Sequence, residues 1–114
     1  MAAKPQRLKQ RREFLAAASR GRKVATPGIV LQWLDRSDIE PVRFGFTTTR
    51  KIGNAVIRNR ARRRLREAAL QVTRETAIVG ADLVLIGRHD TATRNFAALL
   101  GDLRAAIRKI GRHD

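Results

Sequence analysis

The chain has 114 residues, which is the size of one domain with a modest hydrophobic core. Its 25 Lys and Arg outnumber its 10 Asp and Glu, so the formal net charge is +15. A free protein with this charge repels itself, and a permanent anionic partner is therefore expected. The absence of cysteine excludes disulfides and thiolate metal sites. No apolar run approaches the roughly 20 residues needed to span a membrane.

Apolar residues make up 43% of the chain and fall in periodic blocks, unlike those of a disordered basic tail. The N-terminus is basic but lacks an apolar segment, so it is not a secretory signal. A transit peptide has a similar composition and stays open as an alternative. We expect a cytoplasmic protein with a single RNA-binding domain over residues 1–114, flexible at 1–6 and 111–114.

The first element is predicted to be a helix over residues 7–20, which ends at Gly21. Its apolar side would be formed by Leu8, Leu15 and Ala18, with Phe14 beside them. Two strand segments follow, at 22–25 and 29–34, separated by the turn signal Thr26-Pro27-Gly28. Trp33 shares parity with Ile29 and Leu31 and is predicted to lie in the core.

Residues 42–49 show the clearest alternation in the chain. Val42, Phe44, Phe46 and Thr48 point one way, and the residues between them point the other. Period two predicts a half-buried strand. Its second face, which carries Gly45, Thr47 and Thr49, is small and polar, so a backbone or a nucleotide could approach it closely.

A long helix is predicted over residues 55–73, after a turn at Gly53 and an N-cap at Asn54. Its apolar stripe covers only about 80° of the circumference and consists of Ile57, Ala61, Leu65, Ala68 and Val72. Six arginines over nine positions occupy most of the remaining surface; they are Arg58, Arg60, Arg62, Arg63, Arg64 and Arg66.

The apolar run Leu83–Ile86 predicts a strand covered on both sides, as is typical of parallel pairing. Thr91 or Thr93 would cap a last helix, whose core stripe consists of Phe96, Leu99, Leu100, Leu103, Ile107 and Ile110. The order helix, two or three strands, helix, strand, helix predicts an α/β domain, arranged as an α+β two-layer sandwich. In it, three helices pack on a small four-stranded sheet.

The arginine-rich helix indicates nucleic-acid binding. Like charges three or four residues apart destabilise a helix, and no acid lies between Arg58 and Arg66 to relieve the repulsion. The guanidinium fork suits phosphate oxygens and stacking on bases. Asn59 interrupts the arginines; it is either an exposed neutral residue or a polar group that reaches RNA or a hydrated metal ion.

The sequence offers little for catalysis by protein side chains. The acids are scattered, His89-Asp90 is most simply a surface pair, and His113 lies in the terminal tail. No phosphate-binding loop, dinucleotide fingerprint or zinc spacing occurs.

The chain resembles the protein subunit of bacterial ribonuclease P. The resemblance rests on the segment from Lys51 to Arg60, KIGNAVIRNR, followed by RRLRE at 63–67. Supporting matches are Arg7-Leu8-Lys9, Glu13-Phe14, Gly45-Phe46 and Asp82-Leu83-Val84, which extend the similarity over nearly the whole chain.

This resemblance implies a ribosomal protein S5 domain 2-like fold and a role beside a catalytic RNA that removes the 5′ leader of precursor tRNA with bound Mg²⁺. The protein would be a monomer, one per RNA, with no catalytic residues of its own. Contacts with the catalytic RNA are implied for Arg50, Lys51, Arg58, Asn59, Arg60, Arg62, Arg63, Arg64 and Arg66. A cleft between the first helix and the sheet would bind the leader through Phe14, Gln32, Thr47 and Thr49.

The chain departs from the family pattern at Ala18 and Gln32, where the family often has aromatic residues. Leader contact is therefore expected to depend more on Phe14, on backbone groups and on charge. Two alternatives remain at this point: a ribosomal or general structured-RNA-binding protein, and a self-sufficient metal nuclease that would use Asp82 or Asp90.

Overall fold

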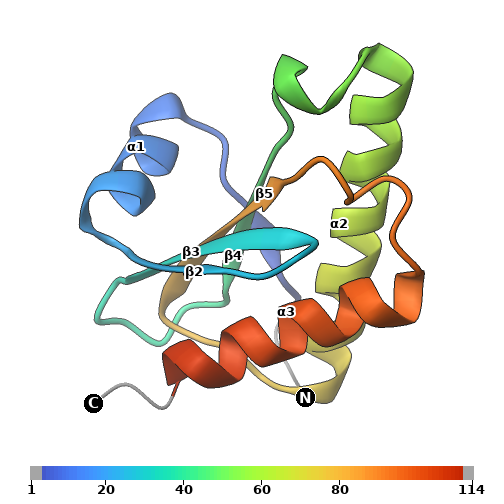
Figure 1. The fold of residues 1–114 in the computed structure, drawn as a ribbon. Coiled ribbons are helices and arrows are strands. Elements are labelled where there is room, and N and C mark those ends of the chain that lie inside the picture. The colour runs from blue at the N-terminus through green and yellow to red at the C-terminus, as the bar shows by residue number, and fades with distance from the viewer. Residues whose placement is uncertain (1–3, 112–114) are drawn as a thin grey trace.

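The computed structural model describes residues 4–111, which form one sheet and three helices (Figure 1). The sheet is built from the strands β1 (Gln6–Arg7), β2 (Arg22–Ala25), β3 (Ile29–Asp35), β4 (Arg43–Thr47) and β5 (Ala81–Gly87). The helices are α1 (Arg11–Arg20), α2 (Ala55–Glu75) and α3 (Phe96–Gly111), and a single 3-10 turn, η1 (Arg50–Ile52), precedes α2.

The sheet is mixed, with the strand order β1-β4-β5-β3-β2. β4 pairs in parallel with both β1 and β5, whereas β3 pairs antiparallel with β5 and β2. β5 therefore lies at the centre, and six of its seven residues are buried. Its parallel pairing with β4, predicted from the apolar run, is confirmed, and the intervening helix α2 makes the crossover.

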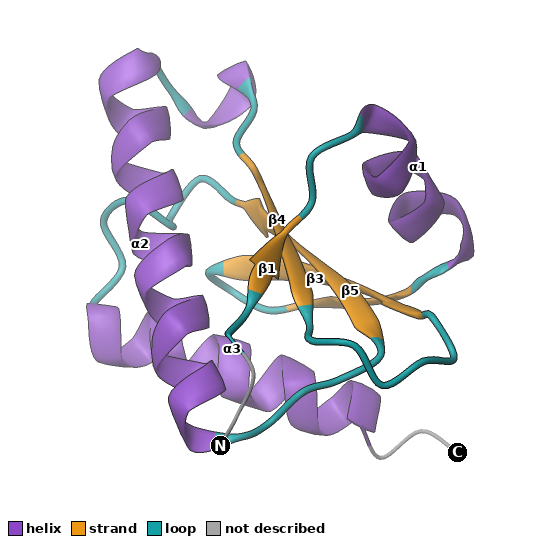
Figure 2. Cartoon of the chain, turned by 180° about the vertical axis from the view of Figure 1, so that it is seen from behind, coloured by secondary structure: helices purple, strands orange, loops and turns teal. Residues whose placement is uncertain are grey.

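The main core lies between one face of the sheet and the helices α2 and α3 (Figure 2). Alternate strand residues, among them Leu31, Phe44 and Leu83, meet Leu65 of α2 and Leu103 of α3 there. The predicted stripe of α2 is confirmed at four of its five positions, which are at most 3% exposed. Ile57, at the N-terminal end, is 37% exposed. Trp33 packs against this core, half-buried.

Helix α1 covers part of the opposite face. There Ala17 is buried, and Phe14 packs with Val84 and Ile86. The predicted apolar side of this helix was wrong in two positions, because Leu15 is 53% exposed and Ala18 is also exposed. The helix begins at Arg11, four residues later than predicted. The side chains that meet the sheet are Glu13, Phe14 and Ala17, which lie on another side of the helix from Leu15 and Ala18.

The predicted α/β fold with three helices is confirmed, with five strands instead of four. The difference arises at residues 6–7, which were predicted to belong to the lead-in and the first helix but form β1. The amides of Gln6 and Leu8 donate to the carbonyls of Val42 and Phe44, so this segment extends the edge of the sheet. The predicted flexible ends fall outside the described residues at 1–3 and 112–114; Gly111 is the last residue of α3.

The predicted caps of α3 at Thr91 or Thr93 were wrong, because Asn95 makes the cap. Its Oδ1 accepts a hydrogen bond from the amide of Ala98 at 3.2 Å. Thr91 is fully buried instead, where its hydroxyl donates to the carbonyl of Gly28 at 2.7 Å and accepts from the amide of Arg88. In the part of the chain that is described, no helix is both long and apolar enough to cross a membrane.

Candidate nucleic-acid interface

The start of α2 is fixed by three residues in a row. Ile52 is buried against Ala61 and Ala92, and it anchors η1 to the helix. Gly53 has φ 145°, a conformation that other residues rarely adopt, and a Cβ there would lie 3.0 Å from atoms of Ile57. The Asn54 side chain accepts a hydrogen bond from the Ile57 amide at 3.0 Å, which confirms the predicted N-cap. The arginines that follow therefore start from a rigid turn.

The exposed basic side chains of η1 and of the first turns of α2 have no acidic partner among the described residues. Arg50, Lys51, Arg60 and Arg63 are exposed, and none of them forms an ion pair with another residue of 4–111. The macrodipole adds to the repulsion, because its positive end lies at the helix N-terminus beside Arg58. Charges held in this way favour an anionic partner.

Arg62 is held by polar neighbours that are not charged. Its Nη2 donates to the hydroxyl of Thr48 at 2.8 Å, and its Nη1 donates to Oδ1 of Asn59 at 3.2 Å. Asn59, for which the sequence left two roles open, thus turns its carbonyl oxygen toward an arginine. The pair fixes the direction of the guanidinium and leaves its charge uncompensated.

Arg64 differs from the other arginines because it binds the protein itself. Its Nε donates to the carbonyl of Thr91 at 3.0 Å, and its Nη2 donates to the carbonyl of Arg94. The guanidinium lies over the ring of Phe96, 5.7 Å from the centroid. Burial, together with the charge of Arg60, lowers the pKa of Arg64, although an arginine stays charged at any physiological pH. Arg64 therefore fastens α2 to the segment before α3.

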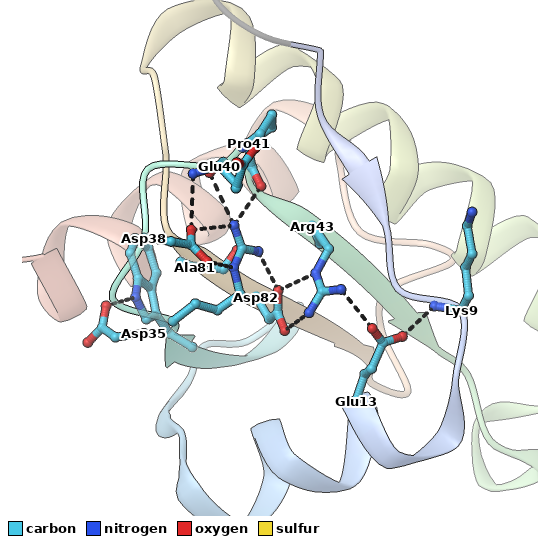
Figure 3. Close-up of polar contacts among 11 residues, drawn as sticks. Lys9, Glu13, Asp35, Asp38, Glu40, Pro41, Arg43, Ala81 and Asp82 are labelled. Atoms are coloured by element: carbon cyan, nitrogen blue, oxygen red, sulfur yellow. Dashed lines mark hydrogen bonds and ion pairs between the residues drawn. The ribbon is translucent and has the colours of Figure 1, made fainter.

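A second group of arginines lies on the other side of the sheet and is fully paired with acids (Figure 3). Asp82 of β5 is 3% exposed and receives three hydrogen bonds from two arginines. Arg43 donates to it through Nε at 2.8 Å and Nη2 at 2.7 Å, and Arg36 donates through Nη1 at 2.6 Å. Arg43 also donates to Glu13 at 2.7 Å. We call Arg36, Asp82, Arg43 and Glu13 the ion-pair chain.

The ion-pair chain joins α1 to the sheet. The second carboxylate oxygen of Glu13 accepts hydrogen bonds from the amides of Lys9 and Gln10, so the same side chain also caps α1. These two amides, with Arg43 beside them, hold the pKa of the Glu13 carboxyl below its usual value. Burial alone would raise the pKa of Asp82, but its hydrogen bonds and charge interactions with Arg43 and Arg36 outweigh burial and lower it.

Three of the four predicted leader-cleft residues share the α1-bearing face of the sheet. Gln32 pairs with Val84 and Thr47 pairs with Ile86, so both lie on the side where Phe14 packs. Thr49 lies beyond the end of β4 and is exposed. Gly45, predicted to lie on an open face, is buried: a Cβ there would fall 2.4 Å from the Phe14 ring.

A hollow of about 610 Å³ lies beside α1, and its lining includes the ion-pair chain together with Arg12 and Arg20. None of the four predicted leader-cleft residues lines it. The assignment of the leader to Phe14, Gln32, Thr47 and Thr49 stays a prediction.

The candidates for protein-borne catalysis are not brought together. Asp82 is occupied by two arginines, whereas His89 and Asp90 are exposed. Among residues 4–111, no three His, Asp or Glu side chains come close enough to hold a metal ion. His113 lies outside the described residues.

The sequence reasoning missed the ion-pair chain because its members are far apart in the chain. One local signal was available: Asp82 directly precedes the apolar run of β5, and a charged residue at the edge of a buried strand requires a partner. The partners themselves depend on the pairing of β4 with β5, which places Arg43 opposite Asp82.

Comparisons with known proteins agree with this architecture. A family model described as Ribonuclease P matches residues 2–111. The ribonuclease P protein component of Gluconacetobacter diazotrophicus is 62% identical, over 97% of this chain and 96% of that protein. That of Paramagnetospirillum magneticum is 48% identical, over 97% and 86%. The Staphylococcus aureus RNase P protein, a solved structure, superposes with a TM-score of 0.77 at 27% identity, over 96% of this chain and 97% of that one. The chain thus belongs to the ribonuclease P protein family.

Proposed function

We propose that this protein is the subunit of a ribonucleoprotein endonuclease that removes the 5′ leader of precursor tRNA. In this proposal the protein binds a catalytic RNA and guides the leader, and the RNA carries out phosphodiester hydrolysis. Family membership supports the subunit role. The further steps rest on the chemistry of the surface of α2 and of the face beneath α1.

The observation that carries the proposal is that most arginines of α2 lack an acidic partner among the described residues. Most of them reach the surface without an acidic partner in 4–111, on a helix whose other side is locked into the core. Unpaired guanidinium groups on a rigid support suit the closely spaced phosphates of a folded RNA. Arg50 and Lys51 of η1 extend the same charge beyond the N-terminus of the helix.

The leader is assigned to the α1-bearing face, where Phe14, Gln32 and Thr47 lie. Phe14 is the one aromatic side chain of the four predicted residues, and base stacking on such a ring contributes about 1–3 kcal/mol. Because Ala18 and Gln32 offer no ring, the leader would gain most of its remaining affinity from backbone groups and from charge.

Mg²⁺ is assigned to the RNA in this proposal. Three of the acids are bound within the fold: Asp82 and Glu13 bind arginines, and Asp102 binds Arg94 together with the amide of Gly28. These side chains do not form a donor set for Mg²⁺. When bound by the RNA, Mg²⁺ would supply a metal-activated water for an in-line attack.

The test is cleavage of a 5′-labelled precursor tRNA at low, near-physiological Mg²⁺ by catalytic RNA alone, by protein alone and by both. We expect efficient cleavage at the mature 5′ end only with both. Cleavage by the protein alone would indicate a self-sufficient nuclease. No gain over the RNA alone would favour a ribosomal or general RNA-binding protein, which should then copurify with ribosomal subunits.

A further inference from the structure

A small pocket of about 150 Å³ lies between β1 and α2, on the sheet face opposite α1. Its walls include the side chains of Phe44, Phe46, Ala69 and Leu70. Phe44 and Ala69 are 3% exposed and belong to the core, whereas Leu70 is 45% exposed. The two phenylalanine rings lie 6.0 Å apart and nearly parallel, at 14°. A ligand would therefore meet apolar walls that are partly anchored in the core and partly exposed.

The volume limits what the pocket accepts. A protein cavity of about 150 Å³ with apolar walls holds one benzene-sized ring. Flat rings also gain specific stacking contacts with aromatic side chains. The pocket is thus suited to a single six-membered ring and is small for a fused two-ring system.

The polar residues of the pocket favour a ligand that carries hydrogen-bond acceptors and negative charge. Arg66 and Arg7 line the pocket together with Gln6, and no acid lines it. The Nε of Arg66 is buried and has no hydrogen-bond partner within 4–111. The protein covers this nitrogen, so a ligand would instead meet the rest of the Arg66 guanidinium, which lines the pocket and forms no ion pair within 4–111. The Arg7 guanidinium lies 5.5 Å from the centre of the Phe46 ring.

The pocket also continues the arginine surface. Arg58, Arg62 and Arg66 are four residues apart and share one flank of α2. Arg62 of this flank binds Thr48, just after β4, so the flank runs along the edge of the sheet where β1 pairs with β4. An RNA strand that follows these charges would reach the pocket at its end.

We infer that the pocket between β1 and α2 binds the base of one unpaired pyrimidine nucleotide of an RNA. The ring lies against Phe46 and Leu70, the Arg66 guanidinium donates to a base carbonyl, and Arg7 is placed for the phosphate. A hydrophobic peptide side chain would fill the apolar part but leave the guanidinium groups of Arg66 and Arg7 without an acceptor. The inference rests on the proposed function, since it names one contact of the proposed RNA-binding surface.

The direct test is an amide NMR titration of the full chain with three probes: UMP, AMP and inorganic phosphate. We expect UMP to shift the amides of Arg7, Phe46 and Leu70, AMP to shift them less at equal concentration, and phosphate to leave Phe46 unchanged. Equal shifts with phosphate alone would show that the site binds only an anion. Equal shifts with AMP would contradict the one-ring limit, and no shifts with UMP would overturn the inference.

Two substitutions locate the site. Arg66→Met keeps an unbranched stem and removes the donor, and we expect it to weaken UMP binding about tenfold. Leu70→Ser, at an exposed position, removes part of the apolar wall and should also weaken it. Their controls are Arg108→Met on α3 and Leu15→Ser on α1, both at exposed positions, which should bind UMP as the parent does. UMP binding unchanged in both test variants would overturn the assignment.

The outcomes separate the pocket from the proposed function. If the protein assists cleavage of precursor tRNA but UMP causes no shifts, only the pocket assignment fails. If UMP binds but the protein gives no gain in the cleavage assay, the pyrimidine site stands and the proposed function fails.

Discussion

The arginines of the ion-pair chain and those of α2 differ in their partners: among the residues that the structure describes, the first are paired with acids, whereas most of the second are not. Arg36 and Arg43 are surrounded by carboxylates and carbonyls, and together they fasten α1, β4 and β5 to one another. Arg60 and Arg63 are exposed on α2 and form no ion pair among the described residues. Whether an arginine stabilises this fold or remains available to an anionic partner therefore depends on whether acids or carbonyls of the protein are bound to it.

Arg64 shows that paired and unpaired arginines can lie next to one another in the sequence. It belongs to the arginine cluster of α2, yet two carbonyls and the Phe96 ring hold it against the start of α3. Substitutions at paired and unpaired arginines, and at their acids, should therefore separate stability from RNA affinity.

The largest effect is expected from Asp82→Asn. The change removes the buried carboxylate that Arg36 and Arg43 share, although each arginine keeps a second acid, Asp38 and Glu13. We therefore expect a loss of about 3 kcal/mol of unfolding free energy. Urea denaturation measures it. The control is Asp35→Asn, whose carboxylate is 66% exposed and pairs with Arg22; we expect a loss below about 1 kcal/mol. Equal losses in the two variants would contradict the role of the ion-pair chain.

The two acids of the ion-pair chain, Asp82 and Glu13, predict how the stability of the protein depends on pH. The pKa values of Asp82 and Glu13 are lower in the folded state than their ordinary values of about 4. Their stabilisation is therefore complete above pH 4–5 and is lost as the pH falls through the lower folded values. Denaturation between pH 6 and pH 2.5 should show this loss in the parent protein and a flatter profile in Asp82→Asn. Parallel profiles would show that Asp82 does not contribute to the acid sensitivity.

Arg64→Ala should lower the unfolding free energy by about 2 kcal/mol, because two hydrogen bonds from a charged donor and a contact with an aromatic face are lost. Arg60→Ala is the matched control on the same helix, and its removal relieves repulsion between like charges. We expect its stability to stay within about 0.5 kcal/mol of the parent. A stable Arg64→Ala variant would mean that the contacts with Thr91 and Arg94 contribute little.

A smaller effect is expected from Glu13→Gln, which keeps a cap acceptor but loses the charge that pairs with Arg43. We expect about 1 kcal/mol and faster amide hydrogen exchange confined to α1. Glu75→Gln breaks an ion pair between α2 and α3 and should leave α1 unchanged. Exchange that rises equally in α2 would show that Glu13 acts on the whole fold.

Much of this molecule could be predicted from its sequence, because the relevant signals are local. The apolar stripe of α2, the Asn54 cap and the alternation of β4 depend on residues close together in the chain. The strand β1 could not be predicted in this way. It has only two residues, and its pairing partner β4 lies more than 30 residues further along.

The same reason explains why Arg60 and Arg64 looked alike in the sequence. Both belong to the same run, and only the return of the chain after β5 brings the carbonyls of Thr91 and Arg94 to one of them. For the candidate site, the sequence therefore predicted which residue types gather on α2, and the fold determines which of them remain unpaired.

The central claim is that unpaired arginines of α2 meet RNA phosphates, and salt dependence tests it most directly. Binding of the catalytic RNA should be measured from 50 to 500 mM salt for the parent, for Arg60→Ala with Arg63→Ala, and for Arg108→Ala with Lys109→Ala at the end of α3. Each lost phosphate contact lowers the slope of log K against log salt by about 0.7–0.9. We predict a slope lower by about 1.5 in the α2 variant and the parental slope in the α3 variant. A parental slope in the α2 variant would contradict the claim.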